Sequence, residues 1–179
     1  VIEKSPSIKA RVISSGFVGS NKAVSIIDHT LSLPSMTDID IKAFKIAKKI
    51  GIKNIALSFT NNSSDVKKLR TIMGEDISII SKIETRAGVE NINEILNVTD
   101  EILIDRGDLS REIAIESIPY MQKYIIKMAN SKNKPVNVAT NLLESMIENT
   151  KPTRAEVNDI INTLNDGADG LVLAAETAI

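Results

Sequence analysis

Residues 77–109 read ISIISKIETRAGVENINEILNVTDEILIDRGDL, and the alternation within this stretch decides the fold. Its two apolar, β-branched runs, residues 77–80 and 101–104, predict short buried strands. Between them apolar residues recur at helical spacing, at Val89, Ile92, Ile95 and Leu96. A strand, a helix and a second strand in this order form the unit from which parallel sheets are built.

The same alternation continues on both sides of this unit. It predicts further strands at residues 54–59, 135–139 and 170–173, and further helices around residues 43–50, 66–73 and 118–128. A last helix opens at Pro152, where Thr153 and Glu156 have the spacing of a capping box. Short apolar strands separated by helices indicate an α/β fold with a parallel sheet covered by helices.

Two architectures contain such a sheet: an open doubly wound sheet and a closed (β/α)8 barrel. A complete barrel typically needs about 250 residues, so the 179 residues of this chain are short for one, and both architectures stay open. Residues 1–36 differ from the rest, because they hold alternating apolar residues and glycines but little helical period. We expect a short β-rich segment there, followed by the sheet and its helices in residues 37–179.

The composition is that of an ordinary globular domain, with 42% hydrophobic and 25% charged residues. The net charge of -1 gives no electrostatic footprint for nucleic acid or an acidic membrane, so neither is an expected partner. The absence of cysteine excludes disulfides, thiolate zinc sites and cysteine nucleophiles. No apolar run approaches the roughly 20 residues of a membrane span. The first residues lack the apolar stretch of a signal peptide, which favours a cytoplasmic location.

Polar and charged residues gather where the predicted strands end. The second strand runs into Lys82 and Glu84, and the third runs into residues 105–108, with the sequence Asp-Arg-Gly-Asp. The fourth strand is followed by Thr140 and the fifth by Glu176. In both parallel architectures, ligands bind at the carboxyl ends of the strands. A single charged residue there is usually a solvated loop residue, so it is the joint pattern at four strand ends that predicts a site.

The residue types at these ends suit an anionic ligand and a metal ion. Glu84 and Asp108 are hard oxygen donors on neighbouring strands, which fits Mg²⁺ held by two carboxylates. Lys82 and Arg106 supply positive charge beside them, and Gly107 lets the backbone approach a ligand closely. Two carboxylates, a metal and a lysine favour a phosphate or an enolate as the ligand.

These residues and their neighbours resemble the pyruvate kinase family. The matching motifs stand in the family's order and close to its spacing: Ile80-Ser-Lys-Ile-Glu84, Arg106-Gly-Asp-Leu109, Ala139-Thr140 with Leu143-Glu-Ser-Met146, Pro152-Thr-Arg-Ala-Glu156, Asp166-Gly-Ala-Asp169 and Glu176-Thr-Ala178. They cover roughly residues 12–179. The resemblance implies part of a (β/α)8 TIM barrel of the phosphoenolpyruvate/pyruvate type, preceded by a short β-rich segment.

The resemblance also divides the chain into parts. Residues 1–36 correspond to the end of the family's small inserted β domain and its return to the barrel, and residues 37–179 to the βα units four to eight. The N-terminal part of the barrel and the C-terminal domain of the family are not matched, so we expect the remainder of a longer chain to carry them. Pro152 to Glu156 lie near the family's subunit contact, which implies a homo-oligomer.

The activity implied is transfer of a phosphoryl group from phosphoenolpyruvate to ADP, giving pyruvate and ATP. Carried over by motif, Lys82 neutralises the phosphoryl group, and Glu84 and Asp108 hold Mg²⁺ or Mn²⁺. The backbone N–H groups of Arg106, Gly107 and Asp108, with Thr140, bind the substrate carboxylate. Glu176 shapes the region that delivers a proton to the enolate. The family's potassium ligands belong to strands that this chain does not match.

Several positions depart from the family pattern. Ser110 stands where the family usually has glycine, Asn141 where it has glutamine, and Asp105 where it has a small residue. Ala174 and Ala175 replace a Ser-Gly pair, and alanine cannot relay a proton. Two alternatives therefore stand beside the kinase: a non-catalytic or regulatory phosphoenolpyruvate- or pyruvate-binding domain, and a related metal-dependent enolate lyase or aldolase that needs no ADP.

Overall fold

The computed structural model describes residues 10–20 and 34–178, and its centre is a five-stranded parallel sheet. The strands are β1 (Asn54–Leu57), β2 (Ser78–Ile83), β3 (Glu101–Asp105), β4 (Val136–Ala139) and β5 (Gly170–Val172). The prediction of a helix-covered parallel sheet is confirmed. The fifth strand ends one residue earlier than predicted, and the second continues to Ile83, so that Lys82 lies within a strand.

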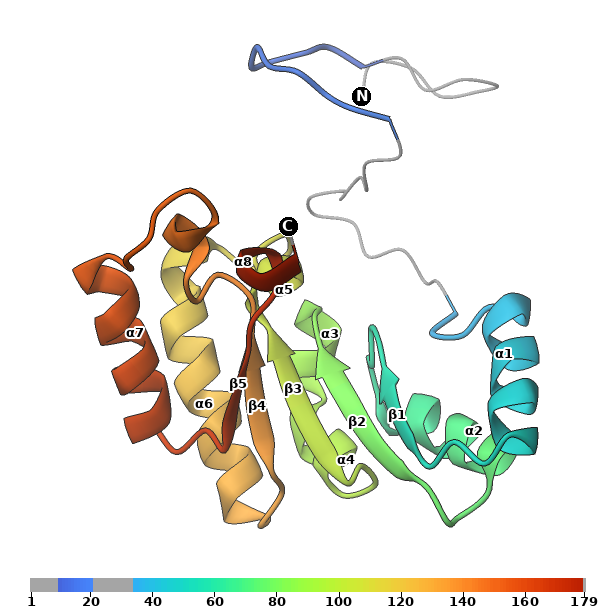
Figure 1. The fold of residues 1–179 in the computed structure, drawn as a ribbon. Helices are drawn as coiled ribbons and strands as arrows, with labels where there is room; N and C mark the ends of the chain where they lie inside the picture. The colour runs from blue at the N-terminus through green and yellow to red at the C-terminus, as the bar shows by residue number, and fades with distance from the viewer. Residues whose placement is uncertain (1–9, 21–33, 179) are drawn as a thin grey trace.

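The order of the strands separates the two architectures that the sequence left open. Each strand pairs with the next one along the chain, in the order β1-β2-β3-β4-β5. A doubly wound sheet would reverse this order at a switch point, whereas a barrel adds its strands in sequence. The long helices run along one face of the sheet in Figure 1. The described strands are therefore a barrel-type segment.

The helices are α1 (Asp38–Lys49), α2 (Ser63–Met73), α3 (Arg86–Glu90), α4 (Ile92–Leu96), α5 (Arg106–Leu109), α6 (Ile118–Ser131), α7 (Arg154–Asn165) and α8 (Ala175–Ala178), with 3-10 turns η1 (Ile115–Ser117) and η2 (Glu144–Ile147). Five of the helices, α1, α2, α3, α5 and α7, begin with a side-chain cap. Thr153 and Glu156 form the predicted capping box of α7, and α1 and α2 begin in the same way. Among the described residues, no helix is both long and apolar enough to cross a membrane.

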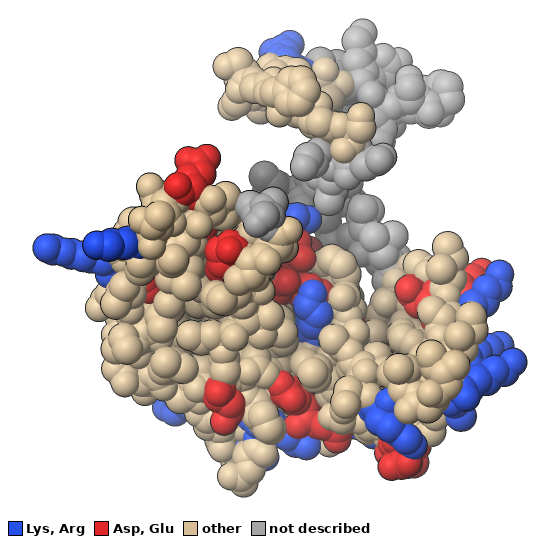
Figure 2. All heavy atoms as spheres, in the orientation of Figure 1, with Lys and Arg blue, Asp and Glu red and all other residues tan. Residues whose placement is uncertain are grey.

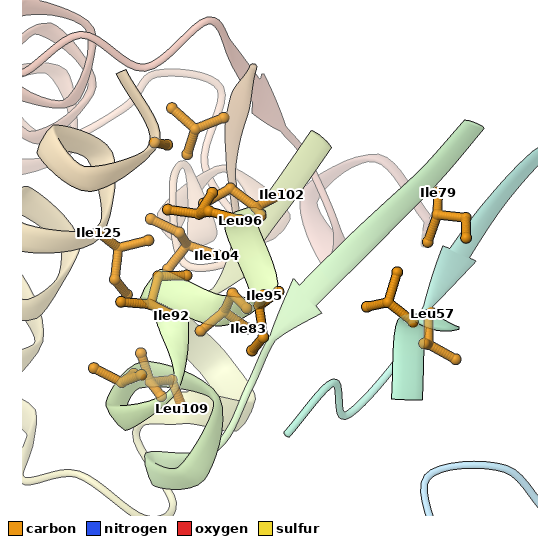
Figure 3. Packing of buried hydrophobic residues seen from close by; sticks show 14 of the residues in the cluster. Leu57, Ile79, Ile83, Ile92, Ile95, Leu96, Ile102, Ile104, Leu109 and Ile125 are labelled. Atoms are coloured by element: carbon orange, nitrogen blue, oxygen red, sulfur yellow. The ribbon is translucent and has the colours of Figure 1, made fainter. Parts of the chain in front are cut away.

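The hydrophobic core lies between the sheet and the helices. Strand β2 alternates half-buried and buried residues along its length, as a strand with one face against helices does. Figure 3 shows part of the resulting core, which joins side chains of β1, β2 and β3 to those of α4, α5 and α6: Leu57, Ile79, Ile83, Ile92, Ile95, Leu96, Ile102, Ile104, Leu109 and Ile125. Each such burial stabilises the fold by about 1.5–3 kcal/mol. The opposite face of β2, turned away from these helices, carries Lys82.

The expected β-rich segment falls largely outside the described residues. Residues 1–9 and 21–33 are not among those described, and residues 10–20 contain neither helix nor strand. The assignment of residues 1–36 to the end of a small β domain therefore stays a prediction.

Candidate active site

The strand register brings the polar residues that follow β2, β3 and β4 to one edge of the sheet. The last paired residues of β2 and β3 are Ile83 and Ile104, so the residues that follow them, Glu84 and Asp105, are neighbours. Asp105 is also paired with the last residue of β4, and Thr140 comes next. The prediction that these strand ends meet is confirmed in the described sheet.

Three carboxylates and one amine meet at this edge. Glu84, Asp105 and Asp108 each offer an oxygen, and these oxygens lie within 4.8 Å of one another. The Nζ atom of Lys82 is 2.5 Å from Glu84 Oε1 and 3.4 Å from Asp105 Oδ2. Figure 2 shows acidic and basic atoms side by side above β2 and β3. The site therefore carries a net negative charge that a divalent cation can balance.

The environment of Lys82 favours its charged form. Burial lowers the pKa of the amine, but the hydrogen bond and ion pair with Glu84, together with the charge of Asp105, outweigh burial and raise the pKa above its usual value. Lys82 is therefore a cation at neutral pH. Glu84, whose side chain is 1% exposed, is held from the other side by the backbone N–H of Phe59, at 2.5 Å from Oε2.

The guanidinium of Arg106 points away from the carboxylates. It donates hydrogen bonds to the carbonyl oxygens of Thr140 and Asn141 at 2.8–3.1 Å, and it pairs with Asp159 of α7 at 2.7 Å. Arg106 is buried, and its guanidinium binds the loop after β4 rather than facing a ligand. The sequence-based expectation that its side chain adds positive charge beside the metal is not what the structure shows.

Thr140 connects the β3 and β4 ends. Its φ of 68° and the φ of 53° at Asn141 lie in the left-handed region, and the Arg106 guanidinium holds both carbonyls there. In this conformation Thr140 Oγ1 accepts the Gly107 N–H at 2.8 Å, and its hydroxyl has two acceptors in reach, the Ala139 carbonyl oxygen at 2.6 Å and Asp105 Oδ1 at 3.1 Å. The Asp108 N–H also points to Asp105 Oδ1, at 3.4 Å.

A shallow cleft of about 300 Å³ opens beside this network. It is lined by Asp105, Gly107, Asp108, Arg111, Thr140, Asn141, Glu144, Ala174, Ala175 and Glu176. Glu176 accepts backbone N–H groups from Leu143 and Ala174 at 3.1 and 2.9 Å. Burial acts to raise the pKa of Glu176, but hydrogen bonds from its own backbone N–H and from those of Ala174 and Leu143 prevail and lower it, so Glu176 is an anion at neutral pH.

The donor set fits a divalent cation of the hard type. Mg²⁺ and Mn²⁺ prefer carboxylate oxygens, and Mg²⁺ is usually held by one or two carboxylates together with substrate and water. Glu84 and Asp108 provide two such carboxylates at neighbouring strand ends, with Asp105 between them in the network.

Ser110 stands where the resembling family usually has glycine. The position accommodates serine because its hydroxyl donates a hydrogen bond to the Gly107 carbonyl at 2.8 Å.

Comparison with known proteins shows which family the chain belongs to. The sequence model for the barrel domain of pyruvate kinase matches residues 1–179. The chain belongs to the pyruvate kinase family. A pyruvate kinase from Thermotoga maritima is 45% identical over 175 residues, which cover 96% of this chain and 38% of that protein. One from Methanocaldococcus jannaschii is 43% identical over 182 residues, covering 100% of this chain and 41% of that protein.

A pyruvate kinase from Sporosarcina psychrophila is 42% identical over 175 residues, which cover 96% of this chain and 30% of that protein. The chain thus spans between 30% and 41% of the length of these three relatives. Membership of the pyruvate kinase family accounts for the sequential strand order, because the barrel of that family is of the (β/α)8 type.

Two features of this pyruvate kinase barrel were not predicted from the sequence. The sequence pattern placed Asp105 at a strand end without assigning it a role, and its contacts with Lys82 and Thr140 depend on the register of three strands. The pairing of Arg106 with Asp159 joins residues 53 apart, for which the sequence holds no local signal. Asp105 could have been included, since it stands at a strand end like the residues that were selected.

Proposed function

We propose that this chain supplies the phosphoenolpyruvate- and metal-binding part of a pyruvate-kinase-type phosphotransferase, which converts phosphoenolpyruvate and ADP into pyruvate and ATP. The observation that carries the proposal is the meeting of Lys82, Glu84, Asp108 and Thr140 at the carboxyl edge of the sheet. A cytoplasmic location and the use of potassium, as expected for the family, belong to the same proposal.

The proposed roles follow from the contacts. Lys82 is a charged amine 3.4 Å from Asp105, which lines the cleft, and it neutralises the phosphoryl group as that group leaves the enol oxygen for ADP. Thr140 and the N–H groups of Gly107 and Asp108 bind the substrate carboxylate. The strand ends position these donors before substrate arrives, and the substrate carboxylate would share or replace their present acceptors, Thr140 Oγ1 and Asp105 Oδ1. The enolate that remains takes up a proton to give pyruvate, and Glu176 borders that region of the cleft.

Glu84 and Asp108 are the proposed ligands of Mg²⁺ or Mn²⁺. A bound divalent cation would orient the substrate and offset the charge of the enolate oxygen. Lys82, whose Nζ lies 2.5 Å from Glu84 Oε1, would contact the phosphoryl group from beside these ligands.

A second candidate is a domain that binds phosphoenolpyruvate or pyruvate without turning it over. The observation in its favour is that Ala174 and Ala175 line the cleft beside Glu176 and offer no hydroxyl there. Glu176 itself is an anion held by two backbone N–H groups, so it holds no proton to give at neutral pH.

The experiment that tests the proposal is a coupled assay on the full chain, following pyruvate formed from phosphoenolpyruvate with Mg²⁺, with and without ADP. ADP-dependent turnover supports the kinase. Metal-dependent binding without turnover supports the binding domain, and pyruvate chemistry that needs no ADP points to a lyase or aldolase.

A further inference from the structure

The side chain of Asp105 lies where it shares the donors of the proposed substrate site. It belongs to the last residue of β3 and is 11% exposed, so it is enclosed by the site rather than turned to water. One of its oxygens faces the Thr140 hydroxyl at 3.1 Å and the Asp108 N–H at 3.4 Å. Its other oxygen faces Lys82 Nζ at 3.4 Å.

These three donors are the groups that the proposed function assigns to the substrate. Thr140 and the Asp108 N–H are assigned to the substrate carboxylate, and Lys82 to its phosphoryl group. A carboxylate already in contact with all three lowers their capacity for a second anion, because each donor must be shared or released on binding. The negative charge of Asp105 also opposes an incoming anion across a short distance.

We infer that Asp105 is an internal carboxylate that competes with the anionic substrate for the Thr140 hydroxyl, the Asp108 N–H and Lys82, and so sets the affinity of the site. The site therefore binds a ligand with two anionic groups, such as phosphoenolpyruvate, more weakly than the same site would without the Asp105 carboxylate. This inference rests on the proposed function, since it concerns the same donors.

The charges of the site agree with this competition. Glu84, Asp105 and Asp108 contribute three negative charges, and Lys82 with a divalent cation would contribute three positive ones. Removing Asp105 makes the net charge of the loaded site one unit more positive, which favours an anion. The Arg111 cation, 3.1 Å from Asp108, changes this balance equally with and without Asp105.

The test measures the dissociation constant of phosphoenolpyruvate, without ADP, by calorimetry on the full chain in saturating Mg²⁺. We expect Asp105→Ala to bind phosphoenolpyruvate roughly tenfold more tightly than the wild type, or about 1.4 kcal/mol. Asp105→Asn keeps the shape and one hydrogen-bond acceptor but loses the charge, so it should tighten binding by a smaller factor. If Asp105→Ala fails to fold, Asp105→Asn alone tests the inference.

The matched control is Asp76→Asn, which removes one carboxylate charge from a side chain that is 93% exposed before the amino end of β2. It should leave the dissociation constant unchanged. Binding by Asp105→Asn that equals or is weaker than the wild type would overturn the inference, because Asp105 would then help to build the site.

The proposed function fails in a different way. It is overturned if Mg²⁺-dependent binding of phosphoenolpyruvate survives in Glu84→Gln, or if neither the wild type nor an Asp105 variant binds. Binding by the Asp105 variants alone would support the inference strongly.

Discussion

Lys82→Met removes the charge that joins two of the site's carboxylates and keeps the length of the side chain. In the wild type, Lys82 pairs with Glu84 at 2.5 Å and Asp105 at 3.4 Å, and the two carboxylates are 1% and 11% exposed. Breaking a buried ion pair by removing one partner costs about 3–5 kcal/mol. Because the side chain of Lys82 is 22% exposed, water screens part of this loss, and we expect about 2 kcal/mol.

The effect of Lys82→Met on turnover should exceed its effect on folding. Removing one donor that stabilises transition-state charge costs roughly 10²–10³ in rate, so ADP-dependent pyruvate formation should fall at least that far. Unfolding by urea, followed by circular dichroism with and without Mg²⁺, measures the stability. Excess Mg²⁺ should reduce the difference in free energy of unfolding between Lys82→Met and the wild type, since the metal supplies positive charge to the same carboxylates.

The matched control for this variant is Lys53→Met. Lys53 pairs with Asp76 at the surface, where the two side chains are 57% and 93% exposed, and such pairs contribute at most about 1 kcal/mol. If Lys82→Met retains wild-type turnover and loses no more stability than Lys53→Met, the charge of Lys82 has neither the structural nor the catalytic role assigned to it.

Three further predictions concern residues that support the site. Gly88→Ala should lower the free energy of unfolding by about 1–3 kcal/mol in a urea titration, because a Cβ there would lie 2.7 Å from the Thr60 carbonyl oxygen. An unchanged urea midpoint of unfolding would refute the close contact. Gln122→Leu should lower the free energy of unfolding by about 1–3 kcal/mol and raise the KM for phosphoenolpyruvate. Buried Gln122 donates a hydrogen bond to Thr163 at 3.0 Å and accepts one from Arg106, which holds the Thr140 loop. An unaltered KM would show that this network does not affect substrate binding. The pKa of Glu156 is held at about 2 by Ser145 and Thr153, below its unfolded value, so the stability it contributes is present above pH 4.5 and is lost as the pH falls toward 2; the difference in melting temperature between the wild type and Glu156→Gln should shrink over that interval, and a difference constant with pH would contradict the shift.

The sequence predicted the sheet because its signals are local. The β-branched strands and the apolar residues at helical spacing each lie within a dozen residues, and the capping box at Thr153 and Glu156 needs only two residues at the right distance. Lys82, Glu84, Asp108 and Thr140 were selected for a reason of the same kind, since each stands at the end of a predicted strand. The carboxyl ends of parallel strands meet at one edge whatever their exact register.

The direction of the side chains depended on contacts that the sequence does not show. Arg106 was expected beside the metal, but it turns toward Asp159 and the carbonyls of Thr140 and Asn141. That choice depends on the left-handed turn after β4 and on the position of α7, both set by tertiary packing. The role of Asp105 likewise follows from the register of β2, β3 and β4 rather than from any motif.

The central claim is that Glu84 and Asp108, with Lys82, form a metal-dependent site for phosphoenolpyruvate. The most direct measurement is a calorimetric titration of phosphoenolpyruvate into the full chain, with Mg²⁺ and with a chelator, for the wild type and for Asp108→Asn. The account predicts binding by the wild type that requires Mg²⁺ and is weakened at least tenfold in Asp108→Asn, the loss of one charged ligand costing about 1.4 kcal/mol or more. Binding of equal affinity in the chelator, or the same affinity in both proteins, would contradict it.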